Sequence, residues 1–421
     1  MRQSPFPLEQ ELGMRYYASD TAGIGGKLRS TADDFLVEEI PVAVGDSGPY
    51  LICKLTKKDW ELQHAVKELA KRLGISHRRI GWGGTKDRHA VTSQLISLYE
   101  ITPEKIADVR LKDITLEVLG RSQFPLSLGS LKGNRFDITI RELSGEDIEG
   151  QIQSVTGTAT AGLPNYYGVQ RFGVIRPLTH RIGELILKED YESAVMTYIG
   201  QSFPDEPEEN RATRSIFYET RDAREALHRL PVPMSFERSM LHHLVNHPDD
   251  YKGALKVLPP KLLSMFVSAF QSWLFNSALS MRFDQGTAID EPVPGDLLIF
   301  ENGREDLVTV QNQGIAAQHV KRGRCIIAIF MPGSVTVTKG HSGSAIEHLL
   351  EEQGISPDHF GKAQDLVHSR FNGALRPISL MTPVESLQEG DCVRLKFSLP
   401  PGHYATTVCR EFMKTDPLRM I

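Results

Sequence analysis

The segment from Gly81 to Gln94, GWGGTKDRHAVTSQ, places three glycines ahead of a single acid, Asp87. Glycine adopts backbone conformations that a side chain forbids, so the glycines predict a tight turn. The residues that follow, Val91 to Tyr99, are rich in β-branched and apolar side chains, which is typical of a strand. The segment therefore predicts a strand, a basic turn with a carboxylate at its tip, and a second strand.

Asp87 lies between two cations, Lys86 and Arg88. Nearby positive charge favours the ionised form of a carboxylate, and an ionised, partly buried aspartate can act as a nucleophile. The alternative is an ordinary exposed hairpin turn, in which charged residues are common. The residue types alone favour the exposed turn, so the surrounding sequence has to decide between the two hypotheses.

The length of 421 residues exceeds one typical domain, and we expect two. No apolar run approaches the ~20 residues of a membrane span, and the first residues, MRQSPFPLEQEL, lack a signal pattern. We therefore expect a cytoplasmic protein with no membrane partner. The four cysteines lie far apart and form no CxxC pair, which argues against a zinc knuckle or a disulfide framework.

Positive charge is concentrated around Asp87, although the net charge of the chain is −5. Between Leu51 and Ala90 there are ten cations and four acids. The cations are Lys54, Lys57, Lys58, Lys67, Lys71, Arg72, Arg78, Arg79, Lys86 and Arg88. A basic run that leads to a carboxylate suits a polyanionic substrate with a reactive site inside it. A solvated helix face explains part of this run but not all of it.

The first 160 residues alternate predicted strands and helices, an α+β pattern. The strands are predicted at 34–40, 50–55, 114–119 and 135–142, with a helix at 59–73 and a loose entry segment at 1–26. In the first strand, Glu39 shares a face with Phe35 and Val37 by the period of two. Two interpretations of this acid stay open, a functional acid and an exposed acid on an edge strand.

The character of the sequence changes after the loop LPNYYGVQRFG at 163–173. Helical periodicity dominates from Leu178 to Phe283, and short strands follow in 295–333. Strand patterns return at 375–383 and 392–399, ahead of a helix from about Tyr404. This return predicts an insertion, with the first part of one domain at 1–165, an inserted module at 166–370 and the second part of the first domain at 371–421.

Two further features point to binding or to chemistry. The loop at 163–173 combines aromatic and basic residues without regular periodicity, which is typical of a binding loop whose rings stack on exposed bases.

His243 and His247 lie four residues apart on a predicted helix. The zinc-peptidase pattern requires Glu directly after the first His, where this chain has Leu244. A metal-dependent hydrolase is therefore the weakest hypothesis.

Six segments, in order, resemble the TruD family of RNA pseudouridine synthases. They are DFLVEE (34–39), GGTKDRHAVTSQ (83–94), LKGNRFDI (131–138), LPNYYGVQRFG (163–173), AFQSWLFN (269–276) and LPPGHYATTVCRE (399–411). The resemblance implies an α+β fold, in which a mixed-sheet pseudouridine synthase catalytic domain carries an inserted, largely helical α+β TRUD domain. It also implies conversion of uridine to pseudouridine in tRNA, at uridine-13 in the best-known members, without a cofactor or a metal.

The resemblance implies a role for each matching residue. Asp87 matches the essential aspartate, Phe136 the aromatic residue that stacks on the base, and Asn134 the residue that orients the aspartate. Lys86 stands beside the aspartate in the same motif and would favour its ionised form.

Four other positions complete the implied site. Phe35 and Arg29 match the motif that lines the pocket, and Arg29 occupies a position where Lys also occurs in the family. Glu39 lies beside them. Tyr404 stands where an aromatic residue, commonly Phe, is expected, and Arg171 is expected to meet the RNA backbone.

The leading hypothesis is thus an RNA pseudouridine synthase that acts on tRNA without a small-molecule cofactor. The alternative is a non-catalytic RNA-binding protein that uses the same basic and aromatic surface. We expect a monomer. The sequence favours none of three chemical routes, which are attack on C1′, formation of a glycal, and addition to C6 of the base.

Overall fold

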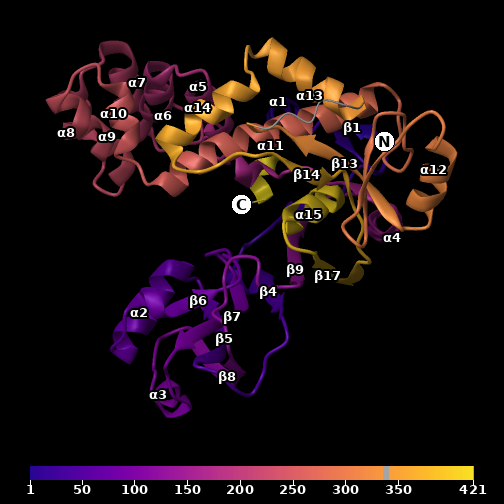
Figure 1. The fold of residues 1–421 in the computed structure, drawn as a ribbon, viewed down its shortest axis with the longest axis horizontal. Helices are drawn as coiled ribbons and strands as arrows, with labels where there is room; N and C mark the ends of the chain where they lie inside the picture. The colour runs from indigo at the N-terminus through magenta and orange to yellow at the C-terminus, as the bar shows by residue number, and fades with distance from the viewer. Residues whose placement is uncertain (335–340, 421) are drawn as a thin grey trace. The chain divides into compact units, whose positions relative to one another are not determined.

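The computed structural model describes residues 1–334 and 341–420 (Figure 1). The chain divides into two compact units, each assembled from separate stretches of sequence. The sheet unit comprises Ser19–Leu163 and Met381–Ile421, and the helical unit comprises Met1–Ala18 and Pro164–Leu380. Helices and strands occur in both units, which confirms the predicted α+β class.

The chain passes between the units after Ala18, Leu163 and Leu380. The predicted domain boundaries, near residues 165 and 370, describe a similar insertion, but they assign residues 1–18 and 371–380 to the other part. Compact packing does not show which stretches fold independently. The domains at 1–165, 166–370 and 371–421 therefore stay a prediction.

One mixed sheet organises the sheet unit. Its strand order is β16-β17-β9-β4-β7-β5-β8, with β3 beside β9 and β6 beside β7. Strand β4 runs parallel to β7 and antiparallel to β9. The strands are β3 (Gly25–Lys27), β4 (Phe35–Ile40), β5 (Tyr50–Lys58), β6 (Ile80–Trp82), β7 (Val91–Tyr99), β8 (Ile114–Ser122), β9 (Gly133–Leu143), β16 (Glu385–Glu389) and β17 (Cys392–Leu399).

Side chains alternate between the two faces of this sheet, and we name one of them the Glu39 face. Phe35, Val37 and Glu39 alternate with half-buried neighbours along β4 and lie on it. Residues opposite one another on neighbouring strands share a face. The register therefore adds Asn134 and Phe136 of β9, Thr92 of β7 and Lys57 of β5, and Gln94 shares the face with Thr92.

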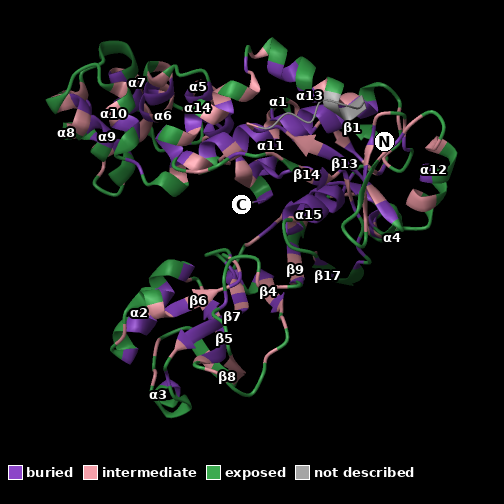
Figure 2. Ribbon diagram, viewed as in Figure 1, coloured by how far each residue is buried: buried purple, intermediate pink, exposed green. Residues whose placement is uncertain are grey.

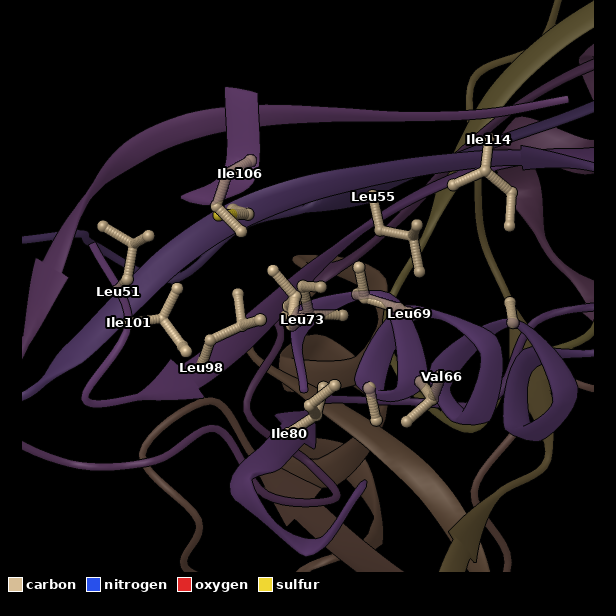
Figure 3. Packing of buried hydrophobic residues seen from close by; sticks show 14 of the residues in the cluster. Leu51, Leu55, Val66, Leu69, Leu73, Ile80, Leu98, Ile101, Ile106 and Ile114 are labelled. Carbon is tan, nitrogen blue, oxygen red and sulfur yellow. The ribbon is translucent and has the colours of Figure 1, made fainter. Parts of the chain in front are cut away.

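Helix α2 (Leu62–Leu73) covers the β5 and β7 part of the Glu39 face (Figure 3). Its buried residues follow the predicted helical spacing and pack on strand residues that include Leu55 and Ile96. Glu61 caps the helix by accepting a hydrogen bond from the His64 amide, and Gly74 ends it in the left-handed conformation. The remaining helical segments of the unit are η1 (Ala32–Asp34), η2 (His77–Arg79), α3 (Pro103–Ala107), α4 (Ile148–Ala161), α15 (Ala405–Met413) and η4 (Pro417–Met420).

Helix α15 is buried along its whole length (Figure 2). It contacts α4 and β3. The C-terminal stretch therefore supplies strands β16 and β17 and a core helix to the unit whose first stretch ends at Leu163.

Helix α11 (Pro260–Asp284) forms the core of the helical unit and packs against α5, α13 and α14. It is long and apolar enough to span a membrane, which corrects the expectation that no such stretch exists, but 72% of its most apolar window is buried inside the protein. The other helices are α1 (Pro7–Glu11), η3 (Val169–Arg171), α5 (Thr179–Leu187), α6 (Tyr191–Gly200), α7 (Glu208–Thr220), α8 (Ala223–Arg229), α9 (Ser235–Asn246), α10 (Tyr251–Lys256), α12 (Gln313–Lys321), α13 (His341–Glu352) and α14 (Pro357–Val367).

Short strands complete this unit. A four-stranded sheet has the order β12-β11-β13-β14. Strand β1 pairs with β2, and β15 pairs with the short strand β10 (Leu163–Pro164). The strands of the unit are β1 (Arg2–Gln3), β2 (Tyr16–Tyr17), β11 (Leu297–Phe300), β12 (Glu305–Leu307), β13 (Cys325–Met331), β14 (Ala374–Pro377) and β15 (Ser379–Leu380).

The expectation of a loose segment at residues 1–26 is wrong. Leu12, Met14 and Tyr17 are fully buried. Side chains of α11 hold the backbone here, since Trp273 donates to the carbonyl of Glu11 and Asn276 donates to that of Leu12. Residues 25–27 then form β3 of the large sheet.

Candidate active site

Asp87 lies in the loop of residues 83–90 that joins the antiparallel strands β6 and β7, as the sequence predicts. Three side chains of the Glu39 face hold this loop. Gln94 donates to the Gly84 carbonyl at 2.9 Å, Glu39 pairs with Lys86 at 2.9 Å, and Lys57 donates to the carbonyl of Asp87 itself at 2.8 Å. The loop is therefore anchored from β7, β4 and β5 together.

The glycines ahead of Asp87 serve a purpose other than the predicted one. None of Gly81, Gly83 and Gly84 adopts a positive φ. A Cβ at Gly81 would lie 2.3 Å from the Leu126 carbonyl oxygen, and one at Gly83 would lie 2.8 Å from that of Ser130. Gly81 and Gly83 are needed because the segment 126–130 packs directly on this backbone, whereas a Cβ at Gly84 would meet only the end of the Lys86 side chain, at 3.3 Å, and Leu131 side-chain atoms at 3.9 Å.

The carboxylate of Asp87 is accessible and held on one side. Its side chain is 57% exposed, and Oδ2 accepts a hydrogen bond at 2.8 Å from Nη2 of Arg29, which is only 11% exposed. The other carboxylate oxygen makes no hydrogen bond within the described parts of the chain. The guanidinium carbon of Arg29 lies 4.1 Å from the ring centroid of Phe35. A fixed cation thus orients an anion that remains open to a ligand.

The backbone around Arg29 is locally constrained. Arg29 has φ of 54°, an uncommon conformation for a residue other than glycine. Thr31 and Asp34 then form a capping box, and Asp34 pairs with Arg141 of β9 at 2.7 Å. Burial acts to raise the pKa of Asp34, but hydrogen bonds from Arg141 and Thr31 outweigh it and lower this pKa overall. These bonds fix the segment that delivers Arg29 and Phe35 to the site.

Lys86 does not pair with Asp87, which corrects the sequence interpretation of this lysine. Its ammonium is buried and pairs with Glu39, whose other oxygen accepts a bond from the Leu95 amide at 3.3 Å. Glu39 is buried on a central strand, so the hypothesis of an exposed acid on an edge strand is wrong. Arg88 is exposed and makes no ion pair with any residue that the structure describes. The cation that does pair with Asp87 is Arg29.

Phe136 and Asn134 lie next to Glu39 on the same face. Phe136 is 7% exposed and stacks on Phe397 of β17, with ring centroids 5.4 Å apart. Asn134 lies between Glu39 and Leu399 in the strand register. It makes no hydrogen bond to Asp87.

Three buried oxygens on the Glu39 face lack hydrogen-bond partners among the described residues. They are Oδ1 of Asn134, Oγ1 of Thr92 and Oε1 of Gln94. Buried polar atoms without partners are rare in folded proteins and call for an explanation, such as a bound molecule. Thr92 and Gln94 were not predicted as site residues, although their alternation in the segment VTSQ places them on one face of a strand.

The two remaining predicted site residues are Tyr404 and Arg171, and the role of Tyr404 stays a prediction. Tyr404 precedes α15 in the sheet unit and is partly buried. Arg171 belongs to the helical unit, where its Nε donates to Ser272 Oγ at 3.2 Å and its guanidinium carbon lies 5.9 Å from the Tyr167 ring centroid. The role of Arg171 toward RNA stays a prediction.

The aromatic rings of the loop 163–173 take part in the packing of the helical unit, and their stacking on bases stays a prediction. Tyr166, Tyr167 and Phe172 are buried in the helical unit. Tyr166 shares a hydrogen bond with Ser280 at 2.7 Å, so its hydroxyl is used within the core.

The histidine pair has a local role. His243 forms a hydrogen bond to Asp250 at 2.9 Å, and His247 follows the end of α9. Among residues 1–334 and 341–420, no cluster of three His, Cys, Asp or Glu side chains has a metal-binding arrangement.

The family model described as tRNA pseudouridine synthase D (TruD) matches residues 11–412. The chain belongs to the TruD family. It is 39% identical to a protein of Methanococcoides burtonii named as a tRNA pseudouridine synthase D, over 98% of both chains. A relative of the same name from Pyrococcus furiosus is 35% identical over 97% of this chain and all of its own length.

A solved structure agrees with this assignment. The crystal structure of TruD from Methanosarcina mazei superposes with a TM-score of 0.83 at 37% identity, and covers 99% of this chain and 100% of that one. The fold of this chain is therefore the TruD fold, as the resemblance implies. All six TruD-like segments of the sequence fall inside the matched range.

Proposed function

We propose that this TruD protein isomerises uridine to pseudouridine in tRNA, at uridine-13, with Asp87 as the essential aspartate. Membership of the family supports activity on tRNA. The observation that carries the role of Asp87 is its accessible carboxylate, with one oxygen held by Arg29 and the other open to a ligand. An aspartate held in this way is suited to nucleophilic chemistry.

The surroundings of Asp87 suit a flipped base. The reaction breaks the N1–C1′ bond and forms a C5–C1′ bond, while the proton on C5 is released and N1 gains one. The uridine must leave its stack at a cost of a few kcal/mol, and an aromatic ring such as Phe136 recovers roughly 1–3 kcal/mol by stacking. The unpartnered oxygens of Asn134, Thr92 and Gln94 offer hydrogen-bond acceptors to a polar base.

The test is release of tritium from a tRNA transcript that carries [5-³H]uridine, with chelator present. We expect release by the wild type and a loss of roughly 10⁴-fold or more in Asp87→Asn, which keeps the shape of the side chain but removes its charge. A second transcript, in which cytidine replaces uridine-13, tests the position and should release no tritium. Wild-type activity in Asp87→Asn would contradict the proposal.

A non-catalytic RNA-binding protein is the alternative. It predicts no release of tritium by the wild type and unchanged tRNA binding in Asp87→Asn. A cytoplasmic location and a monomeric state also stay predictions, which subcellular fractionation and light scattering would check.

A further inference from the structure

Lys57 is a buried cation at the end of β5, on the Glu39 face. Lys57 belongs to the basic run of the sequence, but this residue is only 1% exposed. Its Nζ donates at 2.8 Å to the backbone carbonyl of Asp87. The same strand end is tied to the loop twice more, because the Asp59 amide donates to the carbonyl of Ala90 and the side chains of Asp59 and His89 meet at 3.1 Å.

This ammonium lacks the partner that buried cations usually have. Lys57 forms no ion pair with any residue in 1–334 or 341–420. Lysine is almost never fully buried without a pair, because removing its charge from water is costly. A lysine that is buried and bonded to the backbone of the proposed nucleophile therefore has a function in the site as its most direct explanation.

Burial and the charged groups on neighbouring elements together set the pKa of Lys57. Burial lowers the pKa of Lys57 to about 8, while the negative charges of Asp87 in the loop, Glu61 at the start of α2 and Asp59 after β5 oppose this shift. Lys86 of the loop adds to the lowering. Lys57 therefore changes its charge within the range in which enzymes are assayed.

We propose that Lys57 is a positioning residue for Asp87, whose hydrogen bond fixes the backbone of the nucleophile and whose positive charge supports the carboxylate while tRNA is bound. The inference rests on the proposed function and deepens it. A tRNA brings phosphates close to Asp87, and like charges disfavour one another at short range. Arg29 offsets this repulsion through its ion pair with the Asp87 carboxylate. Lys57 offsets it from the backbone, through the positive charge that it places at the Asp87 carbonyl.

The first test is the pH dependence of the wild type. Tritium release at low tRNA concentration follows kcat/KM, which reports the free enzyme. It should fall as the pH rises through about 8, because Lys57 loses its proton there. An unfolded lysine keeps its proton up to about pH 10.4. Between these values the unfolded chain binds more protons, so the contribution of Lys57 to stability rises with pH. Activity and this stability contribution thus change in opposite directions, which a merely structural lysine would not produce.

Three variants separate charge from hydrogen bonding. Lys57→Gln keeps a donor but not the charge, and should lower kcat by about 10- to 100-fold. Its Kd for tRNA should stay within about threefold, because a buried ammonium does not reach a phosphate. Lys57→Arg stays protonated, so its activity should exceed that of Lys57→Gln and show no fall near pH 8. The matched control is Lys58→Met, which removes the neighbouring exposed lysine that pairs with Asp33 and should keep the alkaline fall.

The outcomes distinguish this inference from the proposed function. A wild type that releases no tritium at any pH overturns the proposed function and the inference with it. An active wild type without the alkaline fall, or Lys57→Gln at the wild-type rate, overturns the inference alone. Circular dichroism at the assay temperature gives the folded fraction of each variant. A loss of activity no larger than the loss of folded protein means that Lys57 only stabilises the fold.

Discussion

Phe136 belongs both to the hydrophobic packing of the sheet and to the proposed site. Its ring stacks on Phe397 and is 7% exposed, so most of its surface contacts protein. It also lies on the Glu39 face, beside Oδ1 of Asn134, which has no hydrogen-bond partner among the described residues. Removing the whole ring would change the stability and the site together, and a milder substitution is needed to separate them.

We predict that Phe136→Ala lowers the free energy of unfolding by about 3–4 kcal/mol, because it leaves a cavity beside Phe397. Phe136→Leu fills most of this space and should cost only about 1 kcal/mol. Phe136→Leu should still lose about 10- to 100-fold in kcat/KM, because stacking on a base contributes roughly 1–3 kcal/mol. Denaturant titration and tritium release measure the two effects.

Phe397→Leu is the control for this prediction, since it weakens the same ring pair from the neighbouring strand. It should resemble Phe136→Leu in stability and keep more activity. Equal activities in the two variants would mean that Phe136 is a core residue without a specific role toward the base.

The identity of the reactive residue could be predicted from sequence, but its ionic partners could not. Asp87, Arg29 and Phe35 occur in motifs, and the structure brings these three together. The sequence suggests Lys86 as a partner of Asp87 because the two are adjacent. The structure pairs Lys86 with Glu39 instead, because β4 and β7 are neighbours in the sheet. Such a pair depends on strand order, which no local pattern contains.

At the scale of elements, the position of the Asp87 loop depends on the segment 126–130. This segment packs against the glycine backbone ahead of Asp87, and the Gly129 amide donates to the Gly83 carbonyl at 2.8 Å. The approach is close enough that no side chain fits at Gly83. The loop is therefore supported on one side by the Glu39 face and on the other by a segment that comes after β8.

We predict that Gly83→Ala pushes the segment 126–130 away from the Asp87 loop, because the new Cβ would lie 2.8 Å from the Ser130 carbonyl oxygen. The change should lower the free energy of unfolding by about 1–3 kcal/mol and reduce tritium release, since Asp87 moves with its loop. Gly157→Ala in α4 is the matched control. Its Cβ meets no atom within 4 Å, and it should raise stability by about 0.5–1 kcal/mol.

Thermal unfolding and tritium release of both glycine variants check this prediction. Wild-type activity and stability in Gly83→Ala would show that the segment 126–130 adjusts freely. The prediction about the loop would then fail.

Elements with a clear period could be predicted, and short elements without one could not. Helix α2 and strands β4, β5 and β7 follow the spacing of their apolar residues. Residues 1–18 form two-residue strands and a single short helix, which carry too few residues to show a period. Their order comes from contacts with α11, far along the chain.

At the scale of the whole molecule, a net charge of −5 coexists with a basic surface in the sheet unit. Five of the ten cations in the basic run are exposed and make no ion pair within the described part of the chain. They are Lys67, Lys71 and Arg72 of α2, Arg78 of η2, and Arg88 of the Asp87 loop. Cations without protein partners are available to bind phosphates. These five residues should therefore account for the salt dependence of tRNA binding.

We predict that tRNA binding weakens linearly in a plot of log K against log salt concentration. Lys71→Ala should reduce the slope of this plot by about 0.7–0.9, which corresponds to one phosphate contact. Lys256→Ala, which removes an exposed lysine of the helical unit, should leave the slope unchanged. Filter binding over a range of salt concentrations measures both slopes, and a flat plot for the wild type would contradict the prediction.

The pairing of β17 with β9 has a consequence for how the protein is made. On the ribosome, β9 emerges well before β17, and the stretch Pro164–Leu380 of the helical unit is synthesised between them. Until β17 and α15 follow, β9 lacks one neighbour, and Phe136 lacks the ring of Phe397. Unpaired strand edges favour aggregation during synthesis. A nascent chain therefore completes the helical unit while its Asp87 site is still unfinished, and a stalled ribosome would leave an inactive and aggregation-prone protein.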